Sequence, residues 1–259
     1  MSQLHAQVFG EHSRHLIILH GFLGMGDNWK THAKRWVEEG WTVHLLDQRN
    51  HGRSFWSDIF DYPVLAEDLR NYINASAIEN CTLLGHSMGG KTIMHYAGKY
   101  PDTVDRLIVA DMGVKGYVPH HHDILNGLAS LDFNRIETRK EAEVQLQAYV
   151  PDFGTRQFLM KNLYWKVKGV LGLRLNIAVL KQAVETVVQA LPDHIMVDLP
   201  TLFLKGAQSD YIVEGDQAGI VRKFPKASFA TIEKAGHWLH AENPEDFRNT
   251  IHDWLEKAQ

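Results

Sequence analysis

One serine in this sequence lies between two glycines, a setting that predicts nucleophilic chemistry. The pentapeptide Gly-His-Ser-Met-Gly at 85–89 follows a short apolar run at 81–84 and precedes a helix-like segment at 90–100. Gly-x-Ser-x-Gly between a strand and a helix is a nucleophile elbow, a turn so tight that only glycine leaves room on either side of the serine. We therefore predict that the hydroxyl of Ser87 stands clear of the chain, with the backbone N–H of Met88 at the positive end of the following helix.

A serine hydroxyl needs a base to accept its proton, and the base needs an acid to orient it. His237 directly follows the last predicted strand, and we interpret it as the base. Two aspartates are candidates for the acid, because the strand ends of an open parallel sheet point at the site: Asp111 and Asp210. We favour Asp111, since a hydrophobic strand runs straight into it and a buried carboxylate there needs a partner such as His237. Asp210, after the strand that resumes at 201, stays the alternative acid.

A serine that cleaves esters also needs hydrogen-bond donors for the oxyanion. The tripeptide His-Gly-Phe at 20–22 follows the first buried strand, so the backbone N–H groups of Phe22 and Met88 are the predicted donors. The neighbours of these groups and of the base are predicted to bind the substrate, namely His20, Gly21, Leu23, His86 and Trp238. The glycines of the 21–26 loop are spaced Gly-x-x-Gly-x-Gly, which differs from the dinucleotide fingerprint and argues against a nucleotide.

Composition and charge exclude several other classes of function. The chain has 259 residues, 44% of them hydrophobic, which is enough for a full core. Its net charge of −4 gives no reason to expect nucleic acid or an anionic membrane as a partner. The single cysteine, Cys81, excludes an internal disulfide, and no apolar run approaches the 18 residues of a membrane span. No further ligand completes a metal site at His120–His122. We expect a cytoplasmic protein with a small-molecule substrate and no metal.

The elements that must position these residues alternate between strand and helix, which is typical of a mostly parallel sheet flanked by helices. Strands are predicted at 16–19, 42–46, 81–84, 106–110, 201–205 and 229–232. Helices are predicted at 28–39, 61–76, 90–100, 217–224 and 244–257, with Asp61 as an N-cap. From residue 112 to 198 the periodicity is helical and no strand is expected. The simplest interpretation is an α/β core of residues 1–111 and 199–259, interrupted at 112–198 by a helical lid.

Four motifs together resemble the α/β-hydrolase superfamily, and two of them resemble the YbfF-type bacterial esterases in particular. They are HGFLG at 20–24, DQRNHG at 47–52, GHSMGGK at 85–91 and AGHWLHAE at 235–242. The resemblance implies a serine carboxylesterase or acyl-thioesterase that works through an acyl-serine and uses no cofactor. It also implies an acid on the strand before the lid, in agreement with Asp111. The commoner acid position of the fold, three residues after Gly206, holds Ser209.

The sequence leaves other functions open. The same triad could serve a carbon–carbon bond hydrolase, a perhydrolase or a lyase, and the fold also occurs in non-catalytic ligand-binding proteins. Lids supply most of the substrate pocket, and the segment 153–181 is basic with no acidic residue. Its basic residues are Arg156, Lys161, Lys166, Lys168, Arg174 and Lys181. Their charges form either a solvated face or a rim that attracts anionic acyl substrates such as acyl-CoA.

Overall fold

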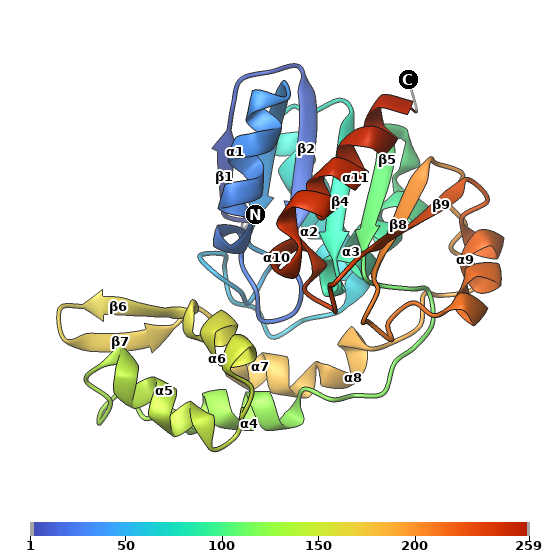
Figure 1. The fold of residues 1–259 in the computed structure, drawn as a ribbon. Helices are drawn as coiled ribbons and strands as arrows, with labels where there is room; N and C mark the ends of the chain where they lie inside the picture. Colours follow the sequence, from blue (N-terminus) through green and yellow to red (C-terminus); the bar gives the residue numbers. More distant parts are fainter. Residues whose placement is uncertain (1–2, 258–259) are drawn as a thin grey trace.

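A seven-stranded sheet forms the centre of the molecule, in the order β1-β3-β2-β4-β5-β8-β9 (Figure 1). The structure is a computed structural model and describes residues 3–257. β1 pairs antiparallel with β3, and every other neighbouring pair in this sheet is parallel. The mostly parallel sheet was therefore predicted correctly, whereas the edge strand β1 was not predicted. The strands are β1 (Ala6–Phe9), β2 (Arg14–Leu19), β3 (Trp41–Leu46), β4 (Cys81–His86), β5 (Val104–Ala110), β8 (Thr201–Gly206) and β9 (Ala227–Ile232).

Helices cover both faces of the sheet (Figure 1). Along β2 the side chains alternate between two hydrophobic clusters, with Leu16 and Ile18 in one and Ile17 and Leu19 in the other. This alternation is expected of a parallel strand that is buried on both faces. The Asp61 side chain caps α2 by accepting a hydrogen bond from the backbone of Val64, as predicted. The flanking helices are α1 (Lys30–Glu38), α2 (Tyr62–Ala75), α3 (Met88–Lys99), α9 (Gln217–Lys223), α10 (Leu239–Glu242) and α11 (Pro244–Lys257).

The chain between β5 and β8 forms a layer over the carboxyl ends of the strands (Figure 1). Its helices are α4 (His122–Ser130), α5 (Arg139–Gln147), α6 (Phe153–Met160), α7 (Ile177–Gln182) and α8 (Val184–Val187). A third hydrophobic cluster joins this layer to the core, with Leu125 and Leu159 from one side and Phe22 and Met88 from the other. We propose that residues 112–198 form the lid.

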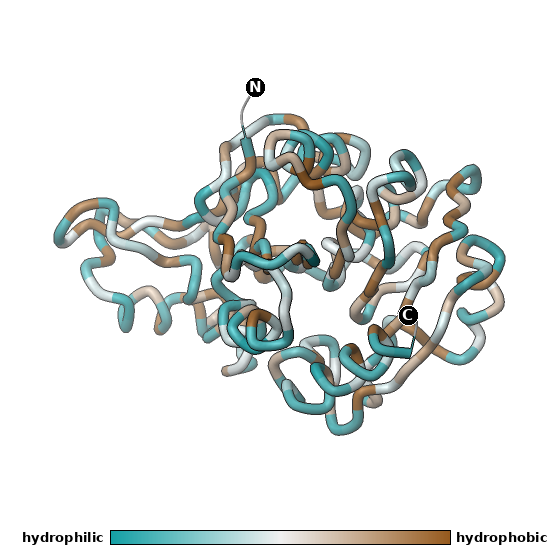
Figure 2. Tube along the Cα trace, turned by 90° about the horizontal axis from the view of Figure 1, so that it is seen from above, coloured by the Kyte–Doolittle hydropathy of each residue, from teal (hydrophilic) through white to brown (hydrophobic). Residues whose placement is uncertain are grey.

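The expectation that the lid contains no strand is wrong. β6 (Leu163–Val167) and β7 (Val170–Leu173) form an antiparallel hairpin, with Gly169 at a φ of +85° in the turn. The hairpin projects from the side of the lid, and from above it extends beyond the rest of the chain (Figures 1 and 2). Leu171 is buried in the lid cluster, while Trp165 is half-exposed and Val167 is exposed. Because the apolar residues lie on both the packed and the exposed sides, they give no clear period of two.

Candidate active site

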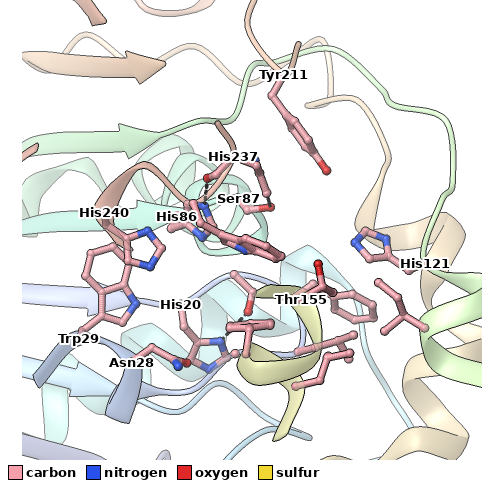
Figure 3. A pocket seen from close by; sticks show the side chains of 18 of the residues that line it. His20, Asn28, Trp29, His86, Ser87, His121, Thr155, Tyr211, His237 and His240 are labelled. Carbon is pink, nitrogen blue, oxygen red and sulfur yellow. Dashed lines mark hydrogen bonds between the residues drawn. The ribbon is translucent and has the colours of Figure 1, made fainter. Parts of the chain in front are cut away.

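Ser87 occupies a strained turn between β4 and α3. Its backbone has a φ of +52° and a ψ of −118°, a conformation that residues with a side chain rarely adopt. The chain packs so closely that a Cβ on Gly85 would lie 2.3 Å from the carbonyl oxygen of Gly89. A Cβ on Gly89 would lie 2.3 Å from the carbonyl oxygen of Leu19. Both glycines of the elbow are therefore required by close backbone contacts, and the turn directs Ser87 into a cavity (Figure 3).

A chain of hydrogen bonds links the three residues predicted as nucleophile, base and acid. Ser87 Oγ lies 3.0 Å from His237 Nε2, and His237 Nδ1 lies 2.8 Å from Asp111 Oδ2. The residues come from three strand ends that are far apart in the sequence: β4, β5 and the loop after β9. This geometry allows the imidazole to accept the serine proton at one nitrogen while the carboxylate fixes the other.

Asp111 is fully buried, and its carboxylate accepts hydrogen bonds from the loop after β8 as well as from His237. The backbone N–H of Gly206 donates to Oδ1 at 3.1 Å, and the hydroxyl of Ser209 donates to Oδ2. The backbone of Asp111 has a φ of +50°, and its N–H donates to the carbonyl of Leu204 at 2.8 Å. Several donors thus compensate a buried charge that would otherwise be costly.

The alternative acid, Asp210, is exposed, and the carboxylate bonded to His237 is that of Asp111. The next residue, Tyr211, stacks on the His237 ring with a centroid distance of 3.9 Å and an interplanar angle of 18°. The Tyr211 hydroxyl lies 3.0 Å from Nε2 of His120. Neither the stack of Tyr211 on His237 nor the contact of Ser209 with Asp111 was predicted from the sequence. The position of Ser209 at the commoner acid site was the one signal that could have indicated its role.

The predicted oxyanion donors lie beside the serine. A Cβ on Gly21 would lie 3.2 Å from the Cβ of Ser87, so the loop that carries Phe22 packs directly against the elbow. Within residues 3–257, the Phe22 N–H makes no hydrogen bond. Met88 is the first residue of α3, where a backbone N–H has no acceptor within the helix. Both N–H groups can therefore donate to an oxygen that develops charge next to Ser87.

Buried polar contacts hold the oxyanion loop in place. The backbone N–H of Gln48 donates to Nε2 of His20 at 3.0 Å, and the Gln48 amide donates to the His20 carbonyl at 2.8 Å. Thr92 of α3 donates to the same Gln48 side chain, and the Leu23 N–H donates to Nε2 of His51. The motif at 47–52 thus supports the loop from behind, and none of its six residues lines the cavity.

The cavity in front of Ser87 has a volume of about 250 Å³ and is bounded by both the core and the lid. Figure 3 shows His121 and Thr155 of the lid facing Ser87 across it. All five residues predicted to bind the substrate line this cavity, namely His20, Gly21, Leu23, His86 and Trp238. The lid contributes His120, His121, Ile124, Thr155, Phe158 and Leu159.

The histidines around Ser87 are mostly uncharged at neutral pH. Burial lowers the pKa of His20 to about 4 and the pKa values of His86 and His121 to about 3. Burial also holds the pKa of His240 well below its usual range. The cavity is therefore rich in neutral hydrogen-bonding groups, which suits an uncharged reacting group such as an ester.

None of the six basic residues of the segment 153–181 lines this cavity. Arg156 is buried and donates to the carbonyls of Val150 and Pro151, so it belongs neither to a rim nor to a solvated face. Lys161 lines a neighbouring cavity that shares Trp238 and His240 with the catalytic one. In the part of the chain that the structure describes, no cluster of three or more side chains suits a metal ion. No helix in that part is long and apolar enough to cross a membrane.

Comparisons with known proteins show what this chain is similar to. A family model described as alpha/beta hydrolase fold matches residues 14–138. The chain is 36% identical over 248 residues to the sn-1-specific diacylglycerol lipase ABHD11 of Mus musculus, covering 93% of this chain and 80% of that protein. It is 31% identical over 245 residues to Esterase YbfF of Escherichia coli strain K12, covering 93% and 92%. A solved marine microorganism esterase has a TM-score of 0.94 and 39% identity, covering 98% of this chain and all of the other.

Proposed function

This chain belongs to the α/β-hydrolase family of esterases and lipases, and we propose that Ser87, His237 and Asp111 are its catalytic triad. The observation that carries the proposal is the continuous hydrogen-bonded path from Ser87 Oγ through the His237 ring to Asp111 at the wall of the cavity. A buried carboxylate, an oriented imidazole and a strained serine that lines the cavity are the parts that acyl transfer requires.

In the proposed reaction, Ser87 Oγ attacks the carbonyl carbon of the ester while His237 Nε2 accepts the serine proton. The negative charge that develops on the carbonyl oxygen is stabilised by the N–H groups of Phe22 and Met88, which are fixed before the reaction begins. His237 then gives its proton to the departing alkoxide or thiolate, and an acyl-serine remains. Water attacks the acyl-serine with His237 again as base, which releases the acid and restores Ser87.

The substrate class that the cavity supports best is a small neutral carboxylic ester or acyl thioester. The walls combine apolar side chains, among them Phe22, Ile124 and Leu159, with neutral imidazoles. The relatives named as a diacylglycerol lipase and an esterase act on carboxylic esters by their names, which supports the same class here. A cytoplasmic location stays a prediction from composition.

A fluorophosphonate probe tests the proposal, because it forms a covalent bond only with an activated serine. We expect labelling of Ser87 alone in the wild-type enzyme and none in Ser87→Ala. Turnover of p-nitrophenyl esters by Ser87→Ala should fall by at least about 10³-fold with the fold intact. Ser76→Ala, at an exposed serine after α2, is the matched control and should keep full activity. Labelling of a different serine in an active enzyme would refute the assignment.

A further inference from the structure

A lysine that the proposed reaction does not use is completely buried next to the nucleophile. Lys91 lies one turn after Ser87 in α3, and its backbone N–H donates to the Ser87 carbonyl at 3.2 Å. Its ammonium nitrogen, Nζ, donates to the carbonyl of Lys115 at 2.8 Å and to the carbonyl of Gln189 at 2.5 Å. No carboxylate within residues 3–257 forms an ion pair with it. The buried amine therefore has two backbone carbonyls as its partners.

These two carbonyls belong to the two connections between lid and core. We name residues 112–117 the outgoing stem and residues 188–191 the returning stem. The stems also bond to each other, because the N–H of Tyr117 donates to the Val188 carbonyl and the N–H of Leu191 donates to the Val114 carbonyl, each at 2.8 Å. Lys91 Nζ lies 5.5 Å from the centre of the Tyr117 ring. The amine is thus placed where both stems meet the nucleophile helix.

Filling of the core does not explain a lysine at this position. Methionine has a similar length and would be buried without the cost of removing an amine from water. Burial lowers the pKa of Lys91 to about 7, which is the sign of that cost. A protonated amine has three N–H donors and a neutral amine has two, so both carbonyls keep a donor in either state. What a lysine provides here and a methionine could not is the pair of hydrogen bonds from Nζ to the two stems.

We propose that Lys91 is a positioning residue that fastens the two lid stems to the nucleophile helix and thereby sets the lid wall of the substrate cavity. The lid side chains Ile124, Phe158 and Leu159 form part of that wall, so their placement depends on where the stems are held. The part of this inference that concerns activity rests on the proposed esterase function. The part that concerns the stems does not.

The outgoing stem also reaches the proposed base. The Tyr117 hydroxyl accepts a hydrogen bond from the Gly113 N–H at 2.7 Å and donates to the carbonyl of Tyr211 at 2.9 Å. Tyr211 is the residue whose ring stacks on His237. A loosened stem should therefore disturb the lid wall first and the support of His237 second.

Hydrogen exchange of the stems tests the proposal without any assay of activity. In Lys91→Met, the amides of Tyr117 and Leu191 should exchange at least about tenfold faster, while those of β4 and β5 keep their protection. Lys99→Met is the matched control, because Lys99 lies on the same helix but is exposed and pairs with Glu67. Unchanged exchange in the stems of Lys91→Met, or faster exchange spread evenly over the chain, would overturn the proposal.

Substrate size gives the second measurement. For p-nitrophenyl octanoate, whose long acyl chain should contact the lid wall, kcat/KM of Lys91→Met should fall by about tenfold, mostly through KM. For p-nitrophenyl acetate the change should stay within about threefold, because the short acyl group depends less on the lid. An equal loss on both esters means that Lys91 does not position the lid wall. If Lys91→Met does not fold, Lys91→Gln keeps one donor group and should show a smaller effect in the same direction.

Discussion

Replacing Asp111 by asparagine should nearly abolish turnover, and the surroundings of the carboxylate explain why. Oδ1 accepts a hydrogen bond from the backbone N–H of Gly206, whose position is fixed. Oδ2 faces His237 Nδ1 and the hydroxyl of Ser209, which can rotate. An asparagine with its NH₂ toward Gly206 would set two donors against each other, so the amide oxygen takes the Oδ1 position and the NH₂ faces His237.

This orientation fixes the histidine in the wrong tautomer. The asparagine NH₂ donates to Nδ1, so the proton of the neutral imidazole lies on Nε2, which then cannot accept the proton of Ser87. In a serine protease the equivalent change lowers kcat by about 10⁴, or about 5.5 kcal/mol of transition-state stabilisation. We expect a loss of the same order here, with little change in KM.

The assay is steady-state hydrolysis of a p-nitrophenyl ester, normalised to folded protein by circular dichroism. Asp210→Asn is the matched control, because the same chemical change is made at an exposed aspartate one residue beyond Ser209. Its kcat should stay within about threefold of the wild type. Asp111→Asn with more than about a tenth of wild-type kcat, or an equal loss in Asp210→Asn, would refute the reasoning about the acid.

Three further predictions concern the surroundings of the triad. Ser209→Ala removes one donor to Asp111 and leaves Gly206 in place, so kcat should fall by about 5- to 30-fold in the same assay. The buried histidines are neutral in the native state, whereas the unfolded chain binds their protons below pH 6.5. The free energy of unfolding should therefore fall by at least about 2 kcal/mol between pH 7 and pH 4 in urea titrations, through buried histidines such as His51, His86 and His121. Charge reversal at Lys166 and Lys168, on the projecting hairpin, should change kcat/KM for an acyl-CoA by less than about threefold at 0.15 M salt. A larger, salt-sensitive loss would restore the steering hypothesis.

The sequence predicted those parts of the molecule that depend on local pattern. The elbow at Ser87 and the cap at Asp61 are such cases, because glycine, serine and aspartate act there through the backbone next to them. The buried strands of the sheet are another, since a run of four apolar residues has few alternatives in an α/β chain. Each of these features is decided within a few residues of sequence.

The features that were missed depend on contacts between distant segments. β1 is a four-residue edge strand of mixed burial, so its pairing with β3 carried no sequence signal. The hairpin β6–β7 is short, and its apolar residues lie on both sides. The stack of Tyr211 on His237 joins two loops, and hydrophobic periodicity in the sequence does not predict which loops lie in contact. The basic lid residues were interpreted from charge alone, which did not show that Arg156 is buried against carbonyl groups.

The pairing of β5 with β8 has a consequence for how such an enzyme can change over evolutionary time. Asp111 directly follows one of these strands and Ser209 lies in the loop after the other, and their side chains meet at the same point beside His237. We therefore expect that an aspartate at position 209 could also bring its carboxylate to His237, with a hydroxyl at position 111 as its neighbour. On this expectation the acid could move from one segment of the gene to another during evolution and keep nearly the same place beside the base. The reciprocal exchange, Asp111→Ser with Ser209→Asp, would reproduce such a migration in one step and would recover activity that each single change loses.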